Sequence, residues 1–183
     1  MITCVNSRLE ESIEQRSGQL VRACYQCGKC SAGCQLAFGM DLLPHRVMKL
    51  VQYGQEARVL SCSTIWLCAS CEACSARCPN GIDVAGVMDA LRQASLESGI
   101  APAQRDVVAF HRSFLAGIRL AGRTNEPVLI AAYKALSRRL FDDLGLGVVM
   151  LRKGKIKAMP RLVQDRDAIR RIFRMSERGS NRQ

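Results

Sequence analysis

A duplicated arrangement of cysteines constrains this chain more than any other feature. Eight of its ten cysteines fall into two copies of the spacing C-x2-C-x2-C-x3-C. The copies comprise Cys24, Cys27, Cys30 and Cys34, and then Cys68, Cys71, Cys74 and Cys78. Every cysteine of the second copy follows its counterpart in the first by 44 residues. Core packing does not place eight cysteines in one register, so the repeat indicates a shared binding chemistry.

This spacing is typical of iron–sulfur ligands. Three thiolates two residues apart bind three irons of one cubane, and the fourth cysteine ligates the neighbouring cluster in two-cluster ferredoxins. Two complete copies therefore predict two 4Fe-4S clusters with crossed ligation, and a chain that transfers electrons. The expected ligands are Cys24, Cys27, Cys30 and Cys78 for the first cluster, and Cys68, Cys71, Cys74 and Cys34 for the second.

Other uses of cysteine fit the pattern less well. Zinc sites usually combine two separated CxxC pairs, or cysteine with histidine. The two histidines, His45 and His111, lie outside both motifs, and neither motif ends in the histidine of a covalent haem site. Disulfides are typical of small secreted chains, and the N-terminal segment MITCVNSRLEESIEQ does not resemble a secretory leader. We therefore expect a reducing, cytoplasmic location.

Two cysteines and one tryptophan outside the repeat need a separate interpretation. Cys62 is expected to be an apolar space-filler, and Cys4 a free thiol near the chain terminus. Trp66 either shields a cluster from water or belongs to the core. His45 and His111 lie in helical segments without companion ligands, and we interpret them as packing or surface residues.

Charge is concentrated at the C-terminal end. The formal net charge is +11, and two oxidised clusters with eight thiolates would lower it to about +7. Residues 152–183 alone carry a net charge of +8. This segment contains one aromatic residue and no recognised nucleic-acid motif, so we expect it to bind a protein partner; the alternative is a solvated tail. No apolar run approaches the length of a membrane span.

Hydrophobic periodicity predicts an all-α fold. We expect helices at residues 6–23, 42–54, 82–99, 102–118, 127–140 and 165–175. Strand signals are nearly missing, and the 33 residues between Cys34 and Cys68 have a helical pattern. The prediction is an α-helical ferredoxin with two cysteine-motif loops at residues 1–122. A basic helical extension for partner docking follows at residues 123–183.

The sequence also resembles a known family, the small iron–sulfur subunits of heterodisulfide reductase. The resemblance rests on YQCGKCSAGC, IWLCASCEACSARCP and LRQASLESGIAPAQR, and it covers roughly residues 20–120. It implies an electron relay that is not itself catalytic, within a hetero-oligomeric complex. In that complex a separate flavoprotein supplies electrons, and another polypeptide with CCG-type motifs carries the clusters at which a disulfide is cleaved. Homologous complexes in sulfur-metabolising bacteria act on other sulfur compounds.

Related families and other functions remain as alternatives. The iron–sulfur subunit of succinate dehydrogenase has a similar helical half, but it typically lacks the middle cysteine of the second triplet, where this chain has Cys71. Subunits of glycolate oxidase fuse a similar module to CCG-type motifs, and no CCG occurs here. A structural or sensory iron–sulfur protein is the alternative from a different class. A freely diffusing ferredoxin is less consistent with the basic charge.

Overall fold

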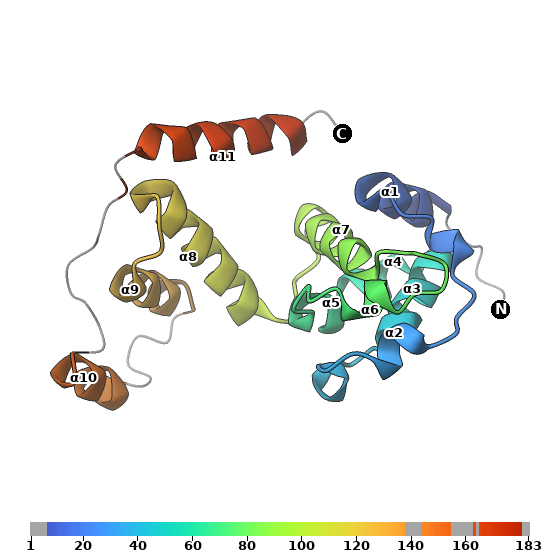
Figure 1. Ribbon diagram of the computed structural model, residues 1–183, viewed down its shortest axis with the longest axis horizontal. Coiled ribbons are helices and arrows are strands. Elements are labelled where there is room, and N and C mark those ends of the chain that lie inside the picture. Colours follow the sequence, from blue (N-terminus) through green and yellow to red (C-terminus); the bar gives the residue numbers. More distant parts are fainter. Residues whose placement is uncertain (1–6, 138–143, 155–162, 164, 181–183) are drawn as a thin grey trace. The chain divides into compact units, whose positions relative to one another are not determined.

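The computed structural model describes residues 7–137, 144–154, 163 and 165–180, and every regular element in these ranges is a helix (Figure 1). The predicted all-α class is therefore confirmed. The chain divides into two compact units, Met1–Gln104 and Arg105–Gln183. This division lies earlier than the expected boundary between residues 122 and 123, because the helix that begins at Arg105 packs against the helices that follow it.

The first unit contains both cysteine motifs and a set of mostly short helices. These are α1 (Ser7–Ser17), η1 (Val21–Ala23), α2 (Lys29–Ala32), η2 (Ala37–Gly39), α3 (Pro44–Gln52), α4 (Glu56–Leu60), α5 (Thr64–Leu67), α6 (Ala73–Ala76) and α7 (Val84–Glu97). Helix α1 packs against α3 and α7, α4 also contacts both, and α5 packs against α7. The two short helices α2 and α6, one from each cysteine motif, contact each other.

The first helix ends earlier than its hydrophobic pattern predicts. Helix α1 ends at Ser17, and Gly18 adopts a left-handed backbone with φ of 65°, a conformation that terminates helices. The expected helix over residues 6–23 is therefore wrong beyond Ser17. The chain turns and forms η1 instead, which leads directly into the first cysteine motif.

Helices α3 and α7 begin and end at the expected signals. Pro44 is the first residue of α3, where its missing N–H costs nothing. Asp83 caps α7 by accepting a hydrogen bond from the N–H of Gly86 at 3.0 Å. Gly54 and Gly99 follow the two helices with φ of 62° and 71°. Both helices are thus fixed in length by local sequence.

The internal repeat extends from the cysteines into these two helices. Residues at equivalent places on α3 and α7 are 40 positions apart, as the first residues Pro44 and Val84 are. The fully buried side chains follow the same relation: Val47 with Val87, Met48 with Met88, and Val51 with Leu91. The cysteines repeat at 44 positions and the helices at 40. The segment between the second motif and α7 is therefore four residues shorter than the segment between the first motif and α3.

The second unit consists of longer helices, α8 (Arg105–Ala121), α9 (Glu126–Ser137), α10 (Leu144–Arg152) and α11 (Arg166–Ser180). Helix α8 contacts α9 and α11, and the ring of Phe110 meets Tyr133 edge-on at 6.0 Å between centroids. Residues 138–140 of the expected helix at 127–140 lie outside the described residues. Within the described ranges, no helix combines the length and the apolar character needed to cross a bilayer.

Candidate metal centres

The two cysteine motifs share one backbone conformation. The residue before the second cysteine has a positive φ in both copies, 64° at Gln26 and 49° at Ser70. So does the residue after the second cysteine, with φ of 77° at Gly28 and 59° at Glu72. Backbone that alternates between right- and left-handed conformations turns successive N–H groups toward one side, which suits sulfur and other anionic ligands. The 44-residue repeat is therefore a repeat of conformation as well as of sequence.

A first cavity lies where the first motif meets the end of the second. It has a volume of about 20 Å³ and is lined by Cys24, Cys27, Cys30 and Cys78. The other lining residues are Gln26, Gly28, His45, Met48, Ile82 and Val84. Gln26 donates a hydrogen bond from Nε2 to Sγ of Cys24 at 3.5 Å. Three cysteines of one motif and the last cysteine of the other thus surround one space.

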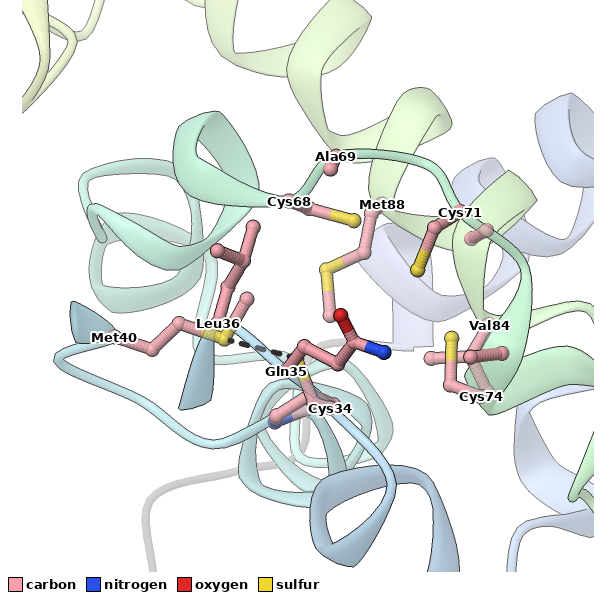
Figure 2. A pocket seen from close by; sticks show the side chains of 13 residues that line it. Cys34, Gln35, Leu36, Met40, Cys68, Ala69, Cys71, Cys74, Val84 and Met88 are labelled. Atoms are coloured by element: carbon pink, nitrogen blue, oxygen red, sulfur yellow. Dashed lines mark hydrogen bonds between the residues drawn. The ribbon is translucent and has the colours of Figure 1, made fainter. Parts of the chain in front are cut away.

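A second, larger cavity has the reciprocal composition. It has a volume of about 170 Å³, and its cysteines are Cys34, Cys68, Cys71 and Cys74. Figure 2 shows the sulfur atoms of Cys68, Cys71 and Cys74 directed toward the same space, with Cys34 on the opposite wall. Gln35 and apolar side chains, including Met88, complete the lining.

Methionine side chains lie beside the cysteines in both cavities. Met48 lines the first cavity and Met88 the second, and these two residues are the buried equivalents on α3 and α7. In the second cavity Sδ of Met40 lies 3.9 Å from Sγ of Cys34 (Figure 2). These apolar thioethers limit the access of water to the cysteines, and solvent access is one determinant of the potential of a cluster.

The donor set suits an iron–sulfur cubane better than a single ion. Four thiolates around a space of their own match the ligation of a 4Fe-4S cluster. A mononuclear zinc site instead needs its ligands within about 2.0–2.3 Å of one point. In the part of the chain that the structure describes, no three His, Cys, Asp or Glu side chains converge in that way. When bound, a cubane would supply one-electron chemistry, and the chain's own residues would ligate it and limit its contact with water.

Burial perturbs equivalent thiols of the two motifs. Desolvation raises the pKa of Cys30, the third cysteine of the first motif, and also raises the pKa of Cys74, its counterpart. Hydrogen bonding with Ser31 and Ser75, respectively, partly opposes this effect. In both motifs burial therefore favours the protonated form of the third cysteine.

Each motif is held at its start by one side chain from a long helix. Gln52 on α3 donates from Nε2 to the carbonyl oxygens of Val21 and Cys24, at 3.0 and 2.9 Å. Arg92 on α7 donates to the carbonyl oxygens of Ile65, at 2.5 Å, and Cys68. The carbonyls of Ile65 and Cys68 lie 44 residues after those of Val21 and Cys24. Gln52 and Arg92 are therefore equivalent clamps on the two motifs.

A serine in each motif ties its short helix to the following long helix. Ser31 Oγ accepts a hydrogen bond from the N–H of His45 at 3.0 Å and lies 2.7 Å from His45 Nδ1. Ser75, its counterpart, accepts from the N–H of Ala85 at 3.3 Å and donates to Asp83 Oδ1 at 2.6 Å. His45 and Ala85 are again 40 residues apart.

Several of these residues were not expected at the site from the sequence. His45 was expected to pack or face solvent, yet it lines the first cavity. Gln52 and Arg92 carry no motif and lie more than 20 residues from the cysteines that they support. The signal that could have identified them is the 40-residue relation between α3 and α7, which pairs these two polar residues directly after the buried pair Val51 and Leu91.

Other singled-out residues lie away from the cavities. Trp66 is buried but lines neither cavity, which favours the core interpretation. Cys62 is also buried, and burial raises the pKa of its thiol, as expected for an apolar space-filler. His111 lies on α8, on the exposed surface of the second unit. Cys4 lies outside the described residues.

Comparison with known proteins agrees with the cysteine geometry. Residues 23–83, about a third of the chain, match the 4Fe-4S dicluster domain family. The chain is 30% identical over 103 residues to the iron–sulfur C subunit of the CoB–CoM heterodisulfide reductase of Methanopyrus kandleri, covering 56% of this chain and 54% of that protein. It is 25% identical over 107 residues to the C subunit of the H2:CoB–CoM heterodisulfide, ferredoxin reductase of Methanothermobacter marburgensis, covering 58% of each.

A third relative covers less of both chains. The C subunit of the ferredoxin:CoB–CoM heterodisulfide reductase of Methanosarcina acetivorans is 35% identical over 77 residues, which is 42% of this chain and 31% of that protein. The chain spans between about a third and three fifths of the length of these curated relatives. The resemblance to the small iron–sulfur subunits of heterodisulfide reductase is confirmed over that part.

Proposed function

We propose that this chain, a homologue of the small iron–sulfur subunits of heterodisulfide reductase over about half of its length, is a non-catalytic electron-transfer subunit with two 4Fe-4S clusters. Cys24, Cys27, Cys30 and Cys78 would hold the first cluster, and Cys34, Cys68, Cys71 and Cys74 the second. Single electrons would pass between a flavoprotein partner and a disulfide- or sulfur-converting partner with CCG-type motifs, in a cytoplasmic complex.

The observation that carries this proposal is the exchange of one cysteine between the two motifs. Each cavity is lined by the first three cysteines of one motif and the fourth cysteine of the other. Such an arrangement supports two clusters held close together by one small unit, which is what a relay requires. A purely structural pair of metal sites has no need of this proximity.

The basic C-terminal extension would bind the partner proteins. Helix α11 is rich in arginine, and apolar Ile172 and Met175 are exposed on it. A surface that combines cations with exposed apolar side chains suits an acidic protein surface with an apolar centre. We assign the extension, residues 123–183, to docking within the complex.

A matched pair of substitutions tests the crossed ligation. Cys78→Ser should damage the first cluster and Cys34→Ser the second, although each residue belongs to the other cluster's motif. Anaerobic iron analysis and EPR of the reduced protein measure the outcome: wild type should contain about eight irons per chain. If Cys78→Ser affected only the signal that Cys68→Ser also removes, the crossed assignment would be wrong.

A further inference from the structure

The two equivalent clamps differ in charge. Gln52 is neutral, whereas Arg92 places a guanidinium against the carbonyl of Cys68 and also donates to Ser70 Oγ at 3.2 Å. Both contacts lie within the second motif. The first motif receives no cation at the corresponding place, because Gln52 contacts the carbonyl of Cys24 there. The two clamps are therefore equivalent in position but differ by one positive charge.

Asp89 neutralises this cation only in part. Its Oδ1 lies 2.5 Å from Nη1 of Arg92, but the Asp89 side chain is 49% exposed while that of Arg92 is 15% exposed. Water screens the outer charge more than the inner one. The exposed charges of the motifs themselves, Lys29 in the first and Glu72 and Arg77 in the second, are screened in the same way. Among these charges the guanidinium of Arg92 is the least exposed and therefore the least screened.

We propose that Arg92 raises the reduction potential of the second cluster above that of the first. Reduction adds a negative charge to a cluster, and a nearby cation that water does not screen stabilises the reduced form. An electron that reaches the first cluster would then move to the second, the one near Met40 and Met88. The inference rests on the proposed function, because it requires a cluster in each cavity.

The experiment is an EPR-monitored redox titration of the full-length, cluster-loaded chain. Arg92→Gln gives the second motif a neutral glutamine, as the first motif has in Gln52. This change should lower the midpoint potential of the second cluster alone. Arg92→Lys keeps the charge and should lower it less. Asp89→Asn removes the opposing carboxylate and should raise the potential of the second cluster, while Gln52→Arg should raise the potential of the first cluster.

The control is Arg58→Gln. It removes an exposed arginine that lines neither cavity, and it should change neither potential.

The outcomes separate this inference from the proposed function. A wild-type chain with fewer than two clusters overturns both. Two intact clusters whose potentials stay unchanged in Arg92→Gln, or shift equally, overturn only the role of Arg92. If Arg92→Gln fails to load the second cluster, Asp89→Asn provides the same measurement, and a potential that does not rise in that variant rejects the inference.

Discussion

The side chain of Arg77 lies over Gly33, and the two residues occupy equivalent positions of the 44-residue repeat. A β-carbon at Gly33 would lie 2.7 Å from Cδ of Arg77 and 2.8 Å from Nη1. These residues follow α2 and α6, the short helices that contact each other. The two copies of the repeat therefore contact each other where the first has the glycine Gly33 and the second has the long side chain of Arg77.

Gly33→Ala should reduce the free energy of unfolding of the cluster-loaded protein by about 1 kcal/mol and so lower its thermal midpoint. The loss is modest because Arg77 is exposed and can move away from the added methyl group. Because the effect acts through Arg77, the double variant Gly33→Ala/Arg77→Ala should be little less stable than Arg77→Ala alone. A double-mutant cycle measures this coupling, and simple additivity of the two losses would contradict it.

Glu72 occupies a left-handed position that Gly28 fills in the first copy. Glu72→Gly relieves backbone strain of about 1 kcal/mol, offset in part by the greater freedom of glycine in the unfolded chain. We expect a stabilisation of less than about 1 kcal/mol, whereas Gly28→Ala should destabilise by about 1 kcal/mol. Thermal unfolding of both variants checks this, with Ala76→Gly at the end of α6 as the control for an ordinary glycine penalty. A loss in Glu72→Gly as large as in Ala76→Gly would refute the prediction.

Asp41 joins the loop after the first motif to the start of α5. Its carboxylate accepts hydrogen bonds from the N–H groups of Leu42, Ser63 and Thr64, at 2.8, 2.8 and 3.0 Å. Burial alone would raise the pKa of Asp41, but these bonds, together with one from the hydroxyl of Thr64 at 2.7 Å, outweigh it and hold the pKa below its usual value. The stabilisation is therefore complete above the unfolded pKa of about 3.9 and is lost as the pH falls through the lower folded value.

Asp41→Asn removes this charge and should cost about 1 kcal/mol near neutral pH, because Asp41 is largely exposed and its bonds are partly screened. The difference in thermal midpoint between wild type and variant should stay constant from pH 8 to pH 5 and shrink below about pH 4. A difference that disappears between pH 8 and pH 5 would show that the ionised carboxylate is not the cause.

Charge reversal on α11 tests the docking role of the extension. Arg171→Glu/Arg174→Glu should leave both clusters intact and reduce co-purification with the partner proteins, most strongly at low salt, where electrostatic attraction is greatest. The matched control, Arg58→Glu/Arg105→Glu, changes the net charge equally at exposed residues outside α11. Equal retention of partners by both variants would reject the assignment.

Among the described residues, local signals in the sequence predicted the helices of nine or more residues apart from α10, but not the short helices α2, α4, α5 and α6. Pro44 and Gly54 bound α3, and Asp83 caps α7, as their residue types indicate. Helix α10 was not anticipated, because two glycines in LGLGVVM lower its helix propensity. The left-handed backbone at Ser70 and Glu72 was also missed, since neither is glycine. It is imposed by the motif around them.

The grouping of cysteines follows from the motif, because three cysteines at two-residue intervals wrap one space and the fourth joins the neighbouring site in two-cluster ferredoxins. The clamps do not. Gln52 and Arg92 are single polar residues on amphipathic helices, where a solvent-facing position is the usual expectation. Only the fold brings them against carbonyls 28 and 24 residues earlier in the chain. Long-range support of this kind leaves no mark in a local pattern.

The sharing of cysteines between the cavities has a consequence for any shorter version of this chain. A peptide with a single motif would contain three of the four cysteines proposed for one cluster and one of the four proposed for the other. Such a peptide could complete a set of four cysteines only by forming a two-fold symmetric dimer, in which each copy contributes its last cysteine to the site of the other. Tethering two such halves in tandem turns a concentration-dependent association into folding within one molecule.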